Sequence, residues 1–167
     1  MPSRFSSLLL QWYDKARRNL PWRGEEDPYK IWLSEVMLQQ TQVDTVVPYY
    51  KKWMERFPSV ESVALATQDE LLKFWEGLGY YSRCRNFHKA CKIVASKHGG
   101  KVPAEWETFL SFPGVGEYTA AAVLSIAFHQ PYSVIDGNVK RVMARLLAFS
   151  EIVEKGTALF EKKLDKW

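Results

Sequence analysis

The chain has 167 residues, of which 47% are hydrophobic and 14% aromatic, and it carries a formal net charge of +4. This length and composition are typical of one globular domain with a hydrophobic core. No stretch approaches the ~20 consecutive apolar residues of a membrane span, and the basic balance weakly favours a polyanionic partner. Cys84 and Cys91 lie about two helical turns apart, so we expect two reduced intracellular thiols and no bridge between them.

The first third of the chain predicts amphipathic helices. Apolar residues recur at helical spacing from Phe5 to Tyr13. Asp27 and Pro28 then supply an N-cap and a proline at the first position of a helix that runs to Leu38. Glu35 falls on the apolar side of that helix, where a lone carboxylate is costly to bury. A glutamate so placed is more often paired or at a rim than catalytic, and both interpretations stay open.

The middle of the chain continues the helical pattern. The apolar stripe from residue 43 to 57 is interrupted by Pro48, which predicts a kink or a pair of short helices. Residues 67–70 have the form of a capping box and open a helix that Gly77-Leu78-Gly79 closes. The next helix begins at Tyr80, carries cysteines and apolar residues inward, and ends at His98-Gly99-Gly100. Its basic residues are expected on the outer surface: Arg83, Arg85, Lys89 and Lys92.

A glycine-rich turn between two helices is the most informative segment. A short helix is expected from Pro103 to Leu110 and an alanine-rich one from Tyr118 to Phe128, joined through Gly114 and Gly116, the latter leaving no Cβ in the turn. Bare backbone N–H groups at the start of a helix suit a phosphate, although an ordinary turn between helices has the same spacing.

An aspartate soon after this turn favours the phosphate interpretation. Asp136 lies in a glycine-flanked turn that opens another helix, marked by apolar residues from 139 to 147, and a last helix is expected from Thr157 to Trp167. Nothing alternates with period two over a useful length. The sequence therefore predicts an all-α fold of about ten short helices.

The hairpin, Asp136 and Glu35 together resemble the helix-hairpin-helix DNA glycosylase superfamily. Three longer segments, residues 32–43, 77–83 and 135–142, are similar to its adenine DNA glycosylase (MutY) family, and the resemblance covers essentially the whole chain. It implies a helix-hairpin-helix DNA glycosylase fold with the active site in a cleft. The catalytic region would be residues 1–167, with the helix-hairpin-helix at about 105–128. Residues 1–25 and 139–167 would form a second helical lobe, which is truncated.

The resemblance also implies a reaction and the residues that perform it. A monofunctional glycosylase of base excision repair would flip adenine, mispaired with 8-oxoguanine or guanine, out of double-stranded DNA and hydrolyse its N-glycosidic bond. Glu35 would be the acid at adenine N7, with its pKa raised by an apolar setting, and Asp136 the anion beside the oxocarbenium ion, with Asn138 orienting the site. The remaining implied contacts are Trp22, Arg23 and Leu38 in the adenine pocket, Gln40 and Tyr80 as wedges, and Gly114, Val115, Gly116 and Thr119 at the DNA backbone.

Two alternative functions are distinguished from this one by individual residues. A bifunctional glycosylase/lyase of the endonuclease III type attacks the sugar with a lysine amine, at a position that is Tyr118 here. A non-catalytic helix-hairpin-helix module that only grips phosphate would gain nothing from Glu35 and Asp136.

The resemblance implies further parts of the family beyond Trp167. These are a four-cysteine loop for a [4Fe-4S] cluster and a C-terminal domain that reads 8-oxoguanine, and Cys84 and Cys91 are not the cluster's ligands. We therefore expect this chain to bind no cofactor and no metal, to be a monomer without a membrane partner, and to act in the cytoplasm at the bacterial nucleoid. In a eukaryote the compartment would be the nucleus or the mitochondrion.

Overall fold

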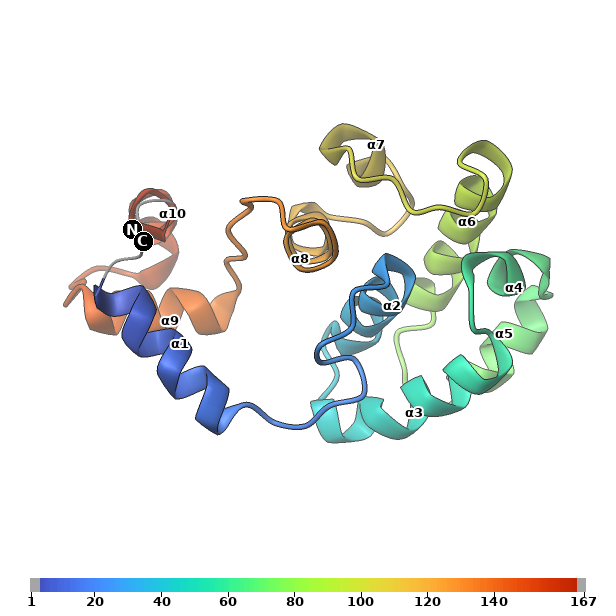
Figure 1. Cartoon of the computed structure of the whole chain (residues 1–167), viewed down its shortest axis with the longest axis horizontal. Helices are drawn as coiled ribbons and strands as arrows, with labels where there is room; N and C mark the ends of the chain where they lie inside the picture. The colour runs from blue at the N-terminus through green and yellow to red at the C-terminus, as the bar shows by residue number, and fades with distance from the viewer. Residues whose placement is uncertain (1–3, 165–167) are drawn as a thin grey trace. The chain divides into compact units, whose positions relative to one another are not determined.

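The computed structural model describes residues 4–164, which divide into two compact units (Figure 1). The larger unit is the continuous segment 20–132, and the smaller combines the described parts of 1–19 and 133–167. Helices are the only regular elements in the described residues, as the all-α prediction requires. None of the described helices is long and apolar enough to cross a membrane.

The smaller unit is built from the two ends of the chain. Its elements are α1 (Arg4–Ala16), α9 (Gly137–Leu146), the 3-10 helix η1 (Val153–Gly156) and α10 (Thr157–Leu164). Its buried core is small and consists of Met143, Ala144 and Phe160, with the Phe149 ring packed edge-on to that of Phe160. Residues 165–167, at the end of the last predicted helix, lie outside the described residues.

The larger unit is organised around one central helix. Its elements are α2 (Pro28–Leu38), α3 (Val43–Arg56), α4 (Val60–Leu65), α5 (Gln68–Trp75), α6 (Ser82–Lys97), α7 (Trp106–Leu110) and α8 (Glu117–Phe128). Helix α2 packs against α3, α6 and α8 (Figure 1). The Trp32 ring of α2 makes edge contacts with Phe87 and Phe109, with centroids 4.8 Å and 5.2 Å apart. The high aromatic content of the chain is therefore used in this core.

Local sequence signals place α2 as predicted. The Asp27 carboxylate accepts a hydrogen bond from the Tyr29 N–H at 2.9 Å, and Pro28 is the first helical residue. The Tyr29 hydroxyl then donates to the Phe57 carbonyl at 2.6 Å and accepts from the Trp53 indole N–H at 3.1 Å. Two buried hydrogen bonds thus fix the start of α2 against the end of α3.

Two predicted elements differ in the structure, and one helix was not predicted. Helix α3 is one continuous helix with Pro48 inside it, so of the two predicted outcomes, a kink or a pair of short helices, the pair is wrong. Helix α7 begins at Trp106 and not at Pro103, because Glu105 has extended backbone with ψ of 126°. Helix α4 was not predicted at all. It has six residues, too few to display a helical period, although Ser59 and Ser62 cap each other reciprocally at its start.

Candidate functional site

The hairpin between α7 and α8 depends on Gly114 for its close packing. Gly114 has φ of +79°, and a Cβ there would lie 2.8 Å from the Asn86 Cβ on α6. Gly116 has φ of −101° and no neighbouring atom within 4 Å of its Cβ position. The lack of a side chain is thus a steric need at Gly114, whereas at Gly116 it leaves open space.

Of the hairpin residues that were predicted to contact the DNA backbone, some are exposed and others are buried. Gly116 is exposed and is the N-cap residue of α8, where it has no side chain to cap the first amides of the helix. The Val115 side chain is buried, and its N–H donates to the Phe112 carbonyl at 3.1 Å. Thr119 is also buried and its hydroxyl accepts from the Gln39 side-chain amide at 3.3 Å. The Thr119 hydroxyl therefore ties α8 to the end of α2, and its contact with the DNA backbone stays a prediction.

Glu35 lies on the central helix of the larger unit. It is half-buried, and the residues one turn before it, Ile31 and Trp32, are fully buried. Leu38, one turn further on, is half-buried against the core. A carboxylate in this position has an apolar side and an accessible side, which is the setting that the sequence predicted.

Two of the three residues predicted for the adenine pocket, Trp22 and Arg23, have different surroundings. Trp22 is buried, and its ring packs edge-on to Tyr50 with centroids 5.1 Å apart. Arg23 is exposed, and its backbone N–H donates to the Leu20 carbonyl at 2.9 Å. Both belong to the larger unit, as Glu35 does.

Asp136 is the N-cap of α9 in the smaller unit. One carboxylate oxygen accepts from the N–H groups of Asn138 and Val139 at 2.8 Å and 2.7 Å. The other accepts from the Asn138 side-chain amide at 2.9 Å, and the Asn138 side-chain oxygen accepts in turn from Arg141. Backbone donors and the positive end of a helix stabilise an ionised carboxylate. The predicted acid and anion thus occupy separate units of the chain.

Gln40 and Tyr80, the predicted wedge residues, share an unusual backbone. Both are exposed, and their φ angles are +55° and +45°. The nearby Arg83 is 8% exposed, and it donates hydrogen bonds to the Gln39 carbonyl, in the turn of Gln40, and to the Gly79 carbonyl, in the turn of Tyr80. Its predicted place on the basic outer surface is therefore wrong. The other three basic residues predicted on that surface, Arg85, Lys89 and Lys92, are exposed as predicted.

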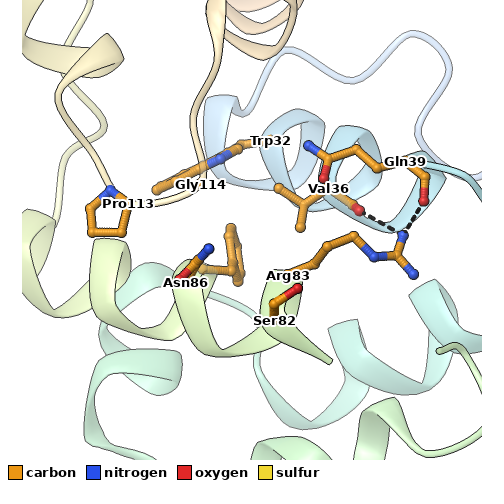
Figure 2. Close-up of a pocket in the computed structure, with 9 residues that line it drawn as sticks. Trp32, Val36, Gln39, Ser82, Arg83, Asn86, Pro113 and Gly114 are labelled. Carbon is orange, nitrogen blue, oxygen red and sulfur yellow. Dashed lines mark hydrogen bonds between the residues drawn. The ribbon is translucent and has the colours of Figure 1, made fainter. Parts of the chain in front are cut away.

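A pocket of about 170 Å³ lies between α2, α6 and the hairpin (Figure 2). None of the predicted adenine-pocket residues lines it, and its volume is below the ~300 Å³ at which small-molecule sites begin. The buried indole N–H of Trp32, at its wall, has no partner among the described residues. The lining consists of Trp32, Val36, Gln39, Ser82, Arg83, Asn86, Phe87, Pro113 and Gly114.

The two cysteines do not fit an iron–sulfur cluster. Both are buried on α6, where burial raises the pKa of the Cys84 thiol to about 12 and raises that of Cys91 as well. A [4Fe-4S] cluster takes four thiolate ligands, and the sequence contains two cysteines. No group of three or more potential metal-binding side chains occurs within the described part of the chain.

Sequence reasoning missed three residues that shape the site. Arg83, Gln39 and Asn86 join α6 and α2 to the turns and the hairpin. No local pattern distinguishes them, because their partners Met37, Thr119 and Gly114 lie 28 or more residues away along the chain. The one available signal was the glycine at position 114, since a glycine beside a helix is typical of a close approach between the backbone and a neighbouring element.

Comparisons with known proteins agree with this geometry. Residues 33–167 match the family model described as HhH-GPD superfamily base excision DNA repair protein. Among solved structures, the chain superposes on a thermostable thymine-DNA glycosylase with a TM-score of 0.87 and 28% identity, over 97% of this chain and 76% of the other. A trapped endonuclease III–DNA covalent intermediate gives a TM-score of 0.78 and 25% identity, over 99% of this chain and 78% of the other.

Curated relatives cover a longer protein. The chain is 44% identical over 142 residues to an adenine DNA glycosylase of Buchnera aphidicola subsp. Baizongia pistaciae, spanning 84% of this chain and 40% of the relative. It is 46% identical over 153 residues to the adenine DNA glycosylase of Homo sapiens, spanning 86% of this chain and 28% of the relative. The chain thus spans less than half the length of these relatives. The match to the family model covers most of the chain, which belongs to the HhH-GPD superfamily of base excision DNA repair proteins.

Proposed function

We propose that this chain is the catalytic region of an adenine DNA glycosylase that removes adenine mispaired with 8-oxoguanine or guanine. The observation that carries the proposal is the Asp136 carboxylate, held by two backbone amides at the start of α9. A fixed anion of this kind serves a reaction that develops positive charge. The relatives named adenine DNA glycosylase support adenine as the base.

Glu35 supplies the proton that the leaving base requires. It is half-buried on α2 beside buried Ile31 and Trp32, and in the proposed reaction it acts as the general acid. Transfer of that proton to adenine N7 makes the base a better leaving group, and the electron pair of the C1′–N9 bond departs with it.

Asp136 stabilises the positively charged sugar that remains when the base departs. The sugar becomes an oxocarbenium ion, and an ionised carboxylate lowers the energy of that charge. Water then adds to C1′ and releases a proton, so that the products are free adenine and an abasic site. The bond from the Asn138 side-chain amide keeps the second carboxylate oxygen in a fixed direction.

The hairpin and the two exposed turns support the binding of double-stranded DNA. The start of α8 at exposed Gly116 offers backbone amides to a phosphate. A base inside a duplex is out of reach, so it must leave the stack, and Gln40 and Tyr80 are exposed side chains that fill the gap.

Tyr118 favours hydrolysis over lyase chemistry. It is an exposed residue in the first turn of α8, and a phenol does not form the imine by which an amine attacks the sugar. The product should therefore be an intact abasic site. Borohydride should trap no covalent adduct between the wild-type chain and DNA, and a trapped adduct would establish a lyase.

The test is single-turnover release of adenine from duplexes with adenine opposite 8-oxoguanine or guanine. Glu35→Gln should bind these duplexes as the wild type does but release no adenine, since the change removes the proton and keeps the shape. Glu55→Gln, an exposed glutamate on α3, is the matched control and should keep the wild-type rate.

Two results would contradict the proposal. Release of adenine by Glu35→Gln at the wild-type rate would remove Glu35 from the reaction. If the wild type binds DNA but releases no base from either duplex, the chain acts as a DNA-binding module.

A further inference from the structure

The Arg83 side chain connects two turns that are far apart in the sequence. Arg83 lies in the first turn of α6 and donates to the carbonyls of Met37 and Gly79 at 2.8 Å and 3.1 Å. It also donates to the Thr41 hydroxyl at 3.1 Å. Further bonds reach the carbonyls of Val36, Gln39, Leu78 and, more weakly, Tyr80. Figure 2 shows the guanidinium beside the carbonyls of Val36 and Gln39.

The two turns hold non-glycine residues in left-handed backbone. Among residues 4–164 only four non-glycine residues have positive φ, and Gln40 and Tyr80 are two of them. This conformation is strained for a residue with a Cβ and persists where the surroundings fix it. Arg83 bonds to the residues on both sides of Gln40, which are Gln39 and Thr41, and to Gly79 and Tyr80 in the second turn.

Carbonyl oxygens accept most of the hydrogen bonds that the positively charged Arg83 side chain donates. Within the described residues it has no ion pair with a carboxylate, and its acceptors include Val36 and Met37 in the last turn of α2. The final carbonyls of a helix lack partners inside the helix and form the negative end of its dipole. Arg83 therefore caps α2 at the point where the chain turns into Gln40.

We propose that Arg83 is a positioning residue that holds Gln40 and Tyr80 in left-handed backbone by tying their turns together, so that both side chains stand ready at one DNA gap. The role of these side chains rests on the proposed function, whereas the tie between the turns does not. A lysine keeps the charge but has three donors on one atom, so it does not span both turns as the planar guanidinium does.

The first test uses the protein alone. Hydrogen–deuterium exchange is measured for peptides covering residues 38–42 and 77–81 in the wild type, Arg83→Lys and Arg85→Lys. Arg83→Lys should speed exchange in both peptides by about tenfold or more, the effect of losing one hydrogen bond to a charged group. Arg85 is exposed on the same helix, and Arg85→Lys should match the wild type. Equal exchange in all three proteins would overturn the tie.

A milder variant covers the case in which Arg83→Lys does not fold. Thr41→Val removes one acceptor of the guanidinium and keeps the side-chain shape. It should speed exchange in residues 38–42 and leave residues 77–81 unchanged. No change in residues 38–42 would overturn the role of this contact.

The second test asks whether Arg83 acts through the two exposed side chains. Base flipping is followed by the fluorescence of 2-aminopurine placed beside the mispaired adenine. Arg83→Lys should reduce the flipping signal in the wild-type background. In a background already carrying Gln40→Ala and Tyr80→Ala it should cause no further loss, because coupled residues are not additive.

The outcomes separate this inference from the proposed function. Equal losses in both backgrounds would mean that Arg83 supports the fold without acting through the wedges, which overturns the positioning role. If the wild type flips no base, the proposed function fails, and the exchange experiment still decides the tie between the turns.

Discussion

Asp136 both caps a helix and carries the charge that we assign to the reaction, and one substitution separates the two roles. In Asp136→Asn the remaining oxygen still accepts from the backbone N–H groups of Asn138 and Val139, so stability should fall by no more than about 1 kcal/mol. The negative charge is lost, and an amide nitrogen replaces the oxygen that faces the Asn138 side chain. Adenine release should fall about a hundredfold or more.

Denaturant unfolding and single-turnover kinetics check this prediction on the same protein. Asp136→Ala is the comparison, because it loses the cap and the charge together. Wild-type kinetics in Asp136→Asn, with loss of stability only in Asp136→Ala, would reduce Asp136 to a helix cap.

Individual residues also mark where sequence reasoning ends. Glu35 could be assigned because a carboxylate on an apolar stripe is visible in the local pattern. Arg83 could not, because in the sequence it looks like exposed Arg85, and its burial goes with hydrogen bonds to carbonyls of residues 36–39 and 78–80. Burial decided by distant backbone groups leaves no local trace.

At the scale of elements, the hairpin offers a matched pair of glycines. Gly114→Ala should destabilise the protein by about 1–2 kcal/mol, since φ of +79° disfavours a Cβ and the Asn86 Cβ would lie 2.8 Å away. Gly116→Ala should change stability by less than about 0.5 kcal/mol, because its backbone is extended and its surroundings are open.

DNA affinity should reveal an effect of Gly116→Ala that the free energy of unfolding does not. A methyl group at exposed Gly116 lies beside the amides that we assign to a phosphate, so affinity should fall although the fold is intact. Fluorescence anisotropy with a mispaired duplex measures it. Wild-type affinity in Gly116→Ala would mean that no phosphate approaches this edge.

Elements were predictable where their signals are local. Asp27 and Pro28 fixed the start of α2, and the glycines around residues 77–79 and 99–100 marked the ends of the helices before them. Six-residue α4 is shorter than two helical turns, and Pro48 breaks a pattern that tertiary packing nevertheless keeps in one helix. Packing between elements, and not propensity, decided these two cases.

At the scale of the whole molecule, the reactivity of the two thiols is a measure of the folding of the larger unit. Cys84 and Cys91 are buried within residues 20–132, and burial raises the pKa of both. At pH 8 a thiol reagent should therefore label the native protein orders of magnitude more slowly than the unfolded chain. Stability should also fall as the pH rises past about 8.5, since unfolded thiols then ionise and folded ones do not.

Labelling kinetics across a denaturant series provide the measurement, with α-helical circular dichroism as the independent signal. Replacement of both cysteines by alanine should abolish labelling and flatten the alkaline slope. A native thiol that reacts as fast as an unfolded one would contradict the burial described for α6.

The composition of the smaller unit from both chain ends has a consequence for synthesis. Helix α1 is made before the larger unit, and its exposed apolar residues Leu8, Leu9, Leu10 and Trp12 precede by more than a hundred residues the α9 segment that belongs to the same unit. At about 5–20 residues per second, the ribosome needs on the order of ten seconds to reach it. During that interval the segment 20–132 is able to fold, while the nascent α1 segment presents exposed apolar residues that a chaperone would recognise.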